Sequence, residues 1–253
     1  MKSIVLPVLI AVMLFSCTKK GEIPENQLTK QEIEEGWQLL FDGETLNGWR
    51  GLGRDTLETN SWKVENGFIH KIDSRLIPPL PDGEKIDGGD LITIDTFENF
   101  ELYFEWKIKK DGNSGIKYNV SEKLTNGWGS RFAALGFEYQ ILDDSSNMYK
   151  DLKPHQLSGA LYEIITPKNV HLRPVGEINN GRILVNGNHG EHWLNGIKVL
   201  EFELATAEFD SLYQLSKFAK YPGFQHKRSG HIVITNHIDE SWYRNIKIRT
   251  ISN

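Results

Sequence analysis

The chain has 253 residues, a formal net charge of −5 and a single cysteine, and hydrophobic residues make up 39% of it. An acidic chain whose basic residues never form a cluster of more than a few is not built to bind nucleic acid. One cysteine rules out an internal disulfide and a cysteine-based metal site.

The N-terminus has the pattern of a signal peptide. Lys2 is followed by an apolar run from Ile4 to Phe15, which is too short to span a bilayer. Cys17 then stands where a bacterial lipobox requires its cysteine. We therefore expect residues 1–17 to be a lipoprotein signal peptide with Cys17 as the lipid anchor. This predicts attachment to a membrane of the bacterial cell envelope, on its periplasmic or its outer side; a secreted protein with a free thiol is the alternative.

Residues 18–35 are polar and are expected to form a tether followed by a short helix. Thr29 and Glu32 have the spacing of a capping box, and Gly36 stands where such a helix would end. The rest of the chain, residues 36–251, suits a single large all-β domain.

From Gly36 onward, short alternating runs are separated by glycine, asparagine and aspartate. Residues 100–108 alternate large apolar side chains with polar or charged ones, which predicts a half-buried strand. Asn195 and Gly196 lie between two apolar runs and predict a hairpin. With one helix at about 207–219, the pattern predicts a β-sandwich of jelly-roll type. Further strands are expected at 62–71, 115–120, 161–165, 182–187, 192–194, 197–202, 231–236 and 242–249.

The segment from Gly136 to Asp144 carries the most information about function. Side chains alternate across a strand, so Glu138 and Gln140 point to one face while the apolar residues beside them point to the other. A carboxylate within such a strand is costly to bury unless it is paired. This polar face is therefore expected to meet a ligand; an ordinary solvated strand face is the alternative.

Six motifs occur along the chain in an order typical of one family. They are GWQLLFDGETLNGWR (36–50), GGDLIT (88–93), GNSGIKYNV (112–120), FEYQILDD (137–144), GNHGEHWLNG (187–196) and YRNIKIR (243–249). Through them the chain resembles the 3-keto-disaccharide hydrolase domain family over nearly all of residues 36–249. The resemblance implies a concanavalin A-like jelly-roll sandwich. It also implies cleavage of glycosides or disaccharides whose sugar has been oxidised to a ketone at C3.

The chain departs from that family's pattern at two places. The family usually has tryptophan at the position of Ile178, and a Leu-Gln-Asp-His run where residues 234–237 read Ile-Thr-Asn-His. The second change puts the amide of Asn236 in place of a carboxylate on a strand that could face the site. His237 is kept.

The implied substrate allows a reaction without an oxocarbenium ion. A 3-keto group acidifies the hydrogen on C2, so a base can form an enolate that expels the substituent on C1. Water can then add to the resulting enone, and elimination followed by hydration equals hydrolysis. Such a site needs a general base, a group that stabilises the oxyanion and a proton donor for the leaving oxygen. It does not need the matched carboxylate pair of ordinary glycosidases.

Glu138 is the first candidate for the general base, and Gln140 beside it could orient a sugar hydroxyl. His237 could act as acid, base or metal ligand, since imidazole titrates near neutral pH and binds divalent ions. A divalent ion that polarises the 3-keto oxygen would help to form the enolate, with His237, Glu138 and His192 as candidate ligands. The sequence does not require this ion, because no His-x-His or His-x-x-x-His spacing occurs.

Further residues are candidates for substrate binding. Asn113 and Ser114 could bind sugar hydroxyls, although these residue types also favour turns. Tyr162 and Trp193 could stack on a pyranose ring, although most aromatic residues of such a sandwich belong to its core. Arg182 could stabilise an enolate, and an outer-face salt bridge is the alternative.

Two other kinds of function compete with this hypothesis. Endo-glucanases with the same fold carry Glu, Asp and Glu on one strand, where this chain has Glu138, Gln140 and Asp143. An amide in the middle position disfavours ordinary retaining hydrolysis. A non-catalytic carbohydrate-binding module is the rival from another class, because one fold hosts many functions. A lyase that stops at the elimination product is a third reading.

Overall fold

The computed structural model describes residues 25–57, 60–77, 89–126, 134–221 and 223–251. The predicted signal peptide with Cys17 and the first part of the predicted tether lie outside these ranges. Within them, no helix is both long and apolar enough to cross a membrane.

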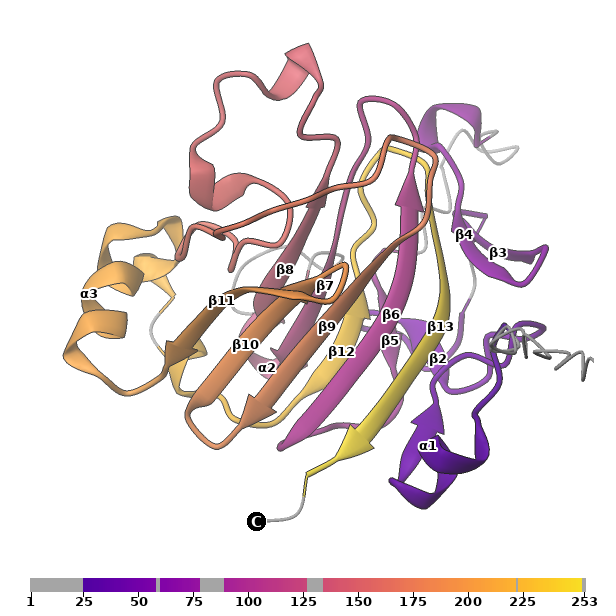
Figure 1. The fold of residues 1–253 in the computed structure, drawn as a ribbon, viewed down its shortest axis with the longest axis horizontal. Coiled ribbons are helices and arrows are strands. Elements are labelled where there is room, and N and C mark those ends of the chain that lie inside the picture. The colour runs from indigo at the N-terminus through magenta and orange to yellow at the C-terminus, as the bar shows by residue number, and fades with distance from the viewer. Residues whose placement is uncertain (1–24, 58–59, 78–88, 127–133, 222, 252–253) are drawn as a thin grey trace, which may run out of the picture.

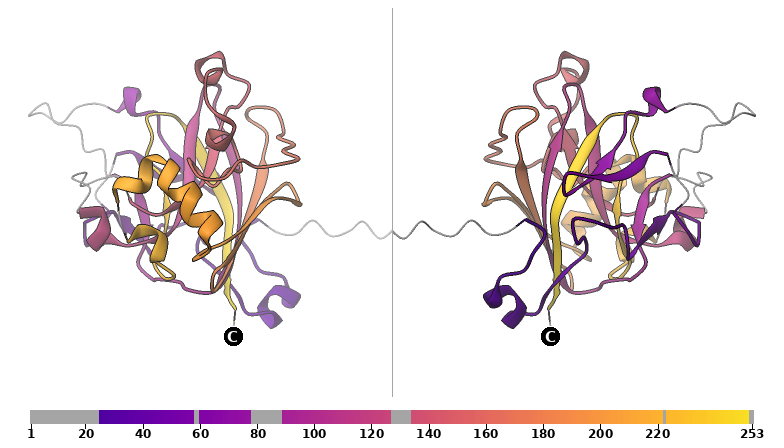
Figure 2. Two further views of the ribbon diagram at one scale, coloured as in Figure 1. Left: turned by 90° about the vertical axis from the view of Figure 1, so that its left-hand side faces the viewer. Right: turned by 90° about the vertical axis from the view of Figure 1, so that its right-hand side faces the viewer.

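Two antiparallel sheets stacked face to face form the body of the molecule (Figures 1 and 2). The larger sheet consists of β1 (Trp37–Leu39), β3 (Trp62–Glu65), β4 (Phe68–Lys71), β6 (Phe100–Ile108), β9 (Asn179–Asn186), β10 (His189–Leu194), β11 (Ile197–Glu203) and β13 (Ser241–Thr250). Its strand order is β11-β10-β9-β6-β13-β4-β3, and β1 also pairs with β13.

The smaller sheet has five strands, and it carries the strand singled out in the sequence. They are β2 (Trp49–Gly51), β5 (Leu91–Thr93), β7 (Asn113–Val120), β8 (Phe137–Leu142) and β12 (His231–Ile234). Their order is β2-β5-β12-β7-β8, so β8 lies at one edge. The predicted all-β sandwich is confirmed.

Short helices connect and cover the sheets. The described residues contain three α-helices where the sequence predicted one in the sandwich and one before it. They are α1 (Lys30–Glu34), α2 (Glu122–Asn126) and α3 (Ala207–Leu215), with 3-10 turns η1 (Ser74–Leu76), η2 (Asn147–Tyr149), η3 (Pro154–Gln156), η4 (Lys217–Lys220) and η5 (Phe224–His226).

Strand β6 shows how the sequence builds the core between the sheets. Phe100 and Phe104 are fully buried, and the ring of Phe104 meets Tyr139 of β8 edge-on with centroids 5.4 Å apart. Glu101 belongs to the opposite face, where its Oε1 accepts a hydrogen bond of 2.7 Å from Arg182. The predicted alternation of this strand is confirmed.

Helix α3 closes one edge of the sandwich (Figure 1). The ring of Phe209 lies 5.9 Å from that of Phe137 on β8 and 5.7 Å from that of Phe202 on β11, so the helix bridges the two sheets. The helix is shorter than predicted because Ser216 leaves the helical conformation, with a ψ of 165°. Its Oγ accepts a hydrogen bond from the backbone N of Phe218, which starts η4.

Local turn signals in the sequence are confirmed at two places. Asn195 and Gly196, with φ values of 50° and 82°, connect β10 to β11. Thr29 and Glu32 form the capping box of α1. The expected single strand at 62–71 is instead a hairpin of β3 and β4, because its asparagine and glycine residues form a turn.

The strand expected at 161–165 does not form. Leu161 makes only isolated bridges, one of them to Tyr139. The segment nevertheless lies along the free edge of β8, where the backbone N of Tyr162 donates a hydrogen bond of 3.0 Å to the carbonyl oxygen of Glu138. This contact sets Tyr162 beside the polar strand.

Replacement of Gly181 by alanine is expected to destabilise the fold. A Cβ on this residue of β9 would overlap the ring of Phe104, and overpacking of a dense core costs about 1–3 kcal/mol. Urea unfolding of the variant measures the loss. Phe104→Leu in the same chain should relieve the overlap, so the double variant should lose less than the sum of the two single losses. Simple additivity would contradict the contact.

Candidate active site

The outer face of the five-stranded sheet carries a group of polar side chains. Strands β7 and β8 pair with Lys117 opposite Glu138 and Gly115 opposite Gln140. Directly paired residues of antiparallel strands share a face. The neighbouring Tyr139 packs in the core, so these polar residues point away from it. The face predicted for Glu138 and Gln140 is therefore the one observed.

Glu138 is a buried carboxylate with one cation close to it. The residue is 6% exposed, and its Oε2 lies 3.9 Å from Lys117 Nζ. Burial raises the pKa of the Glu138 carboxyl, while the charges of Lys117 and Lys217 hold back part of that rise. A Cβ on Gly115 would overlap Glu138 Oε1, so this glycine provides the space that the carboxylate occupies.

Lys117 is a site residue that the sequence reasoning missed. Its side chain is largely buried, and Nζ donates a hydrogen bond of 2.9 Å to the carbonyl oxygen of Ala134. The only signal in the sequence is a lysine that shares strand parity with Asn113 and Gly115, between the apolar residues Ile116 and Tyr118. That signal is weak, because such a lysine usually faces solvent.

Asp90 is a second buried carboxylate that was missed, although it lies in a quoted motif. It directly precedes β5 and is 3% exposed. Its two oxygens accept backbone hydrogen bonds of 2.7 Å from Ala134 and from Asn236. Burial raises the pKa of Asp90, and the charge of Lys117 together with the two backbone hydrogen bonds opposes this rise.

His237 follows β12 and belongs to the same electrostatic environment. Burial is the first cause that lowers the pKa of His237 to about 4; the charge of Lys117 adds to this, and Asp90 opposes it. The imidazole is therefore neutral at neutral pH. The side-chain amide of Asn236 donates a hydrogen bond of 3.0 Å to the carbonyl oxygen of Gly89, so this departure from the family pattern ties β12 to the turn before β5.

Three predicted binding residues lie around Glu138. Gln140 Nε2 donates a hydrogen bond of 3.2 Å to Asn113 Oδ1 at the beginning of β7. Burial, with the charge of Glu138 as a further cause, raises the pKa of Tyr162 to about 12, so the phenol keeps its proton at neutral pH. Lys217 Nζ lies 4.1 Å from the centroid of the Tyr162 ring.

The predictions for Ser114 and His192 are wrong, because both side chains lie between the sheets. Ser114 is 1% exposed, and its Oγ accepts a hydrogen bond of 2.6 Å from the hydroxyl of Tyr243. His192 is fully buried; its Nε2 forms a hydrogen bond of 2.9 Å with the hydroxyl of Tyr118, and its Nδ1 one of 3.1 Å with Gly159 O. Neither can reach a ligand on the outer face.

Trp193 and Arg182 are not brought to Glu138 by the fold. These residues are paired on β10 and β9 of the eight-stranded sheet, with the Arg182 guanidinium 3.9 Å from the Trp193 ring centroid. Arg182 also forms an ion pair of 2.7 Å with Glu101. They lie on the outer face of the other sheet, across the core from Glu138. The outer-face salt bridge considered for Arg182 is what forms.

The metal ligand set predicted from the sequence does not come together, because His192 is in the core. In the described part of the chain, three other groups have ligand atoms within 4.8 Å of one another: His189, Glu191 and Glu201. Lys198 forms ion pairs with both of these glutamates. An ammonium thus already pairs with both carboxylates of that cluster.

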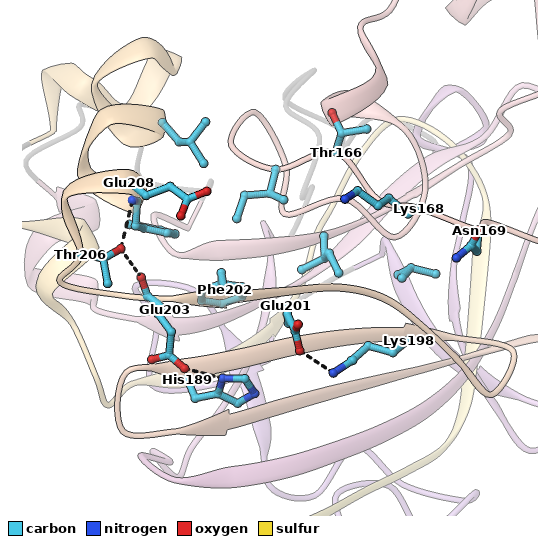
Figure 3. Close-up of a pocket in the computed structure, with 15 residues that line it drawn as sticks. Thr166, Lys168, Asn169, His189, Lys198, Glu201, Phe202, Glu203, Thr206 and Glu208 are labelled. Carbon is cyan, nitrogen blue, oxygen red and sulfur yellow. Dashed lines mark hydrogen bonds and ion pairs between the residues drawn. The ribbon is translucent and has the colours of Figure 1, made fainter.

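A large cavity of ≈780 Å³ lies elsewhere, between β11, α3 and the chain near Lys168 (Figure 3). Its lining includes the apolar residues Phe202 and Phe209 as well as several charged ones. A hydrogen bond of 2.6 Å joins His189 to Glu203 in this lining. None of the predicted catalytic or substrate-binding residues lines this cavity.

Comparison with solved structures indicates the class of protein. A crystal structure from Parabacteroides distasonis, provisionally described as a glycosyl hydrolase, matches with a TM-score of 0.76 and 28% identity, over 90% of this chain and 100% of that one. A second such structure from the same organism, at 18% identity, shares the fold with a TM-score of 0.60, over 97% of this chain and 100% of that one.

The family follows from the sequence. The model of the 3-keto-alpha-glucoside-1,2-lyase-like domain matches residues 36–249. The chain is also 34% identical to a 3-keto-disaccharide hydrolase of Bacteroides thetaiotaomicron, over 96% of this chain and 87% of that protein. The chain belongs to the 3-keto-alpha-glucoside-1,2-lyase-like domain family, a family of glycoside-cleaving enzymes, and the resemblance read from its motifs is confirmed.

The pH dependence of stability tests the burial of Glu138. Its pKa is raised in the folded protein, so ionised Glu138 costs stability, and this cost develops as the pH rises through the folded pKa. Glu138→Gln removes that titration. We expect the Tm of the variant relative to wild type to increase as the pH rises from about 5 to about 8. Glu44→Gln, at an exposed position, should show no trend; a trend-free Glu138→Gln would contradict the raised pKa.

Proposed function

We propose that this protein cleaves 3-keto-glycosides, including 3-keto-disaccharides, by removing the C2 proton and eliminating the C1 substituent. The observation that carries the proposal is Glu138, a buried carboxylate on the outer face of the sheet with Lys117 beside it. Membership of the family and the name of the Bacteroides relative support this class of substrate.

Glu138 acts as the general base in this proposal. A base is most effective when its pKa lies near the working pH, and burial moves the pKa of Glu138 in that direction. A single carboxylate is enough for this reaction. The electrons of the C2–H bond form an enolate, which expels the substituent on C1, so no oxocarbenium ion forms that a second carboxylate would have to stabilise.

Lys117 is suited to stabilise the negative charge that develops on the 3-keto oxygen. Its ammonium is held by Ala134 O and has further N–H donors available for a ligand. In a largely buried position such a charge acts more strongly than it would in water.

The proton donor for the leaving oxygen must be protonated at neutral pH. Tyr162 meets this condition because its pKa is raised to about 12. His237, with a pKa of about 4, contributes as a neutral imidazole that donates or accepts a hydrogen bond. Gln140 and Asn113 are suited to orient sugar hydroxyls. We assign the leaving-group proton to Tyr162 and a polar contact with the sugar to His237.

Two outcomes follow after the elimination step. Addition of water to the enone gives net hydrolysis, as the name of the Bacteroides relative suggests. Release of the enone gives a lyase, as the family description suggests. Both begin with the same proton abstraction. The amide of Asn236, in place of the family's carboxylate, favours the rival of a non-catalytic module. Asp90 weakens that argument, because it provides a buried carboxylate in contact with Asn236.

Glu138→Gln should abolish turnover while binding persists. Loss of a general base typically costs about 10²- to 10⁴-fold in rate, and the amide keeps the shape of the side chain. The assay uses glucosides oxidised at C3, with products identified by NMR and affinity measured by calorimetry. Net hydrolysis gives the free 3-keto sugar and aglycone, whereas a lyase gives an unsaturated ketose. A variant with wild-type turnover would refute the role of Glu138.

The same assay in a chelator tests the divalent ion considered from the sequence. Turnover that is lost on chelation and returns with a divalent ion would add a metal to the site. Turnover that persists leaves Lys117 as the cation that stabilises the enolate.

We also propose that the enzyme is anchored to a membrane of the cell envelope through Cys17. The apolar run before this cysteine supports the proposal. Cys17→Ser should move the protein from the membrane fraction to the soluble fraction in a bacterial host, as immunoblots of the fractions would show. A wild-type protein without a lipid on Cys17 by mass spectrometry would contradict the anchor.

A further inference from the structure

Asp90 has no role in the proposed reaction, yet it is among the most deeply buried charged groups of the described residues. Burying a carboxylate is costly, so a retained one calls for a reason. Its two backbone hydrogen bonds compensate part of that cost. A backbone N–H group does not require a charged acceptor, so the charge of Asp90 is the feature that needs an explanation.

Ala134 links Asp90 to the site. Its backbone N donates to Asp90 Oδ2 at 2.7 Å, and its carbonyl oxygen accepts from Lys117 Nζ at 2.9 Å. Lys117 Nζ in turn lies 3.9 Å from Glu138 Oε2. One residue of the chain therefore sits between the buried carboxylate and the ammonium that serves Glu138.

The other oxygen of Asp90 holds the opposite side of the site. Oδ1 accepts the backbone N–H of Asn236 at 2.7 Å, which fixes the residue before His237. Each carboxylate oxygen of Asp90 is thus linked to one group of the site. Oδ2 is linked to Lys117 through Ala134, and Oδ1 is linked to His237 through the neighbouring Asn236.

Lys117 lies 3.9 Å from Glu138 and is linked to Asp90 through the hydrogen bonds of Ala134. Its charge acts on both Asp90 and Glu138, and it is the largest favourable influence on the ionised form of each. When one ammonium serves two buried carboxylates, each of them is paired less completely than it would be alone.

We propose that Asp90 is a positioning residue for the proton abstraction from C2: it holds Lys117 and the segment before His237 beside Glu138, and it competes with Glu138 for the ammonium of Lys117. This inference rests on the proposed function of Glu138. Competition leaves Glu138 a stronger base than it would be with Lys117 to itself, while the ammonium remains available to the enolate.

The other charged and titratable groups near these residues come from several elements. Glu138 is also influenced by Lys217 on η4 and lies beside Tyr162. Around His237, the further charges are Asp239 and Lys71. None of these groups contacts Ala134 in the hydrogen bonds described above, so removal of the Asp90 charge leaves them in place.

Asp90→Asn is the principal test. The amide keeps the size of the side chain but has one oxygen, so it cannot accept both backbone N–H groups, and it carries no charge. We expect kcat to fall about 10- to 100-fold with little change in KM, by analogy with residues that orient a catalytic group. The acidic limb of the kcat/KM profile should move to lower pH, because Lys117 then pairs with Glu138 alone.

Thr125→Val is the matched control. Thr125 Oγ1 accepts a hydrogen bond of 3.0 Å from the backbone N of Leu135, the residue after Ala134. The variant therefore loosens the same stretch of chain without removing a charge. It should lower Tm and leave the acidic limb where it is in wild type. If both variants shift the limb equally, Asp90 is a structural anchor only and the proposal is overturned.

A reciprocal measurement does not depend on turnover or on the folding of Asp90→Asn. Carboxyl ¹³C NMR titration of Asp90 in Glu138→Gln should show a lower pKa than in wild type, since Lys117 is then left to Asp90. An unchanged Asp90 pKa would refute the competition. Failure of the proposed function is a separate result, namely wild-type turnover by Glu138→Gln, and it leaves this titration interpretable.

Discussion

The alternation of side chains along β7 and β8 is the constraint on which the rest of the structure depends. Phe137 and Tyr139 of β8 enter the aromatic core, so Glu138 and Gln140 must face outward. The pairing with β7 then sets Lys117 opposite Glu138, on the same face. The register of β7 and β8 therefore determines both which side chains pack in the core and where the charged side chains lie. A shift by a single residue would exchange the two faces.

Burial gives these outward-facing charges their chemical character. Two carboxylates lie where water solvates them poorly, so burial raises the pKa of Glu138 and of Asp90, and the charge of Lys117 opposes that rise in both. On a solvated sheet face the same residues would titrate as ordinary surface groups. The low exposure of Glu138, rather than its identity alone, makes it suited to the role of general base in the proposed reaction.

Local features were predictable from sequence because they depend on neighbouring residues. The alternation that points Glu138 outward and the Asn195 turn are of this kind. Ser114 was misjudged because it was taken as a turn residue, although β7 already begins at Asn113. Trp193 was grouped with the residues around Glu138 although it lies on the other sheet, since alternation predicts a face but not which sheet carries it. Asp90 was missed because its contact with Asn236 joins residues 146 positions apart.

The break in the chain at Ser216 has a consequence for the dynamics of the enzyme. It turns the chain from α3, whose Phe209 closes the edge of the sandwich, directly into the turn that carries Lys217. The charge of Lys217 acts on Glu138. A local opening of that edge would therefore withdraw a positive charge from the base while both sheets stay folded. Thermal inactivation would then precede global unfolding, because it requires only that the apolar contacts of Phe209 at this edge open.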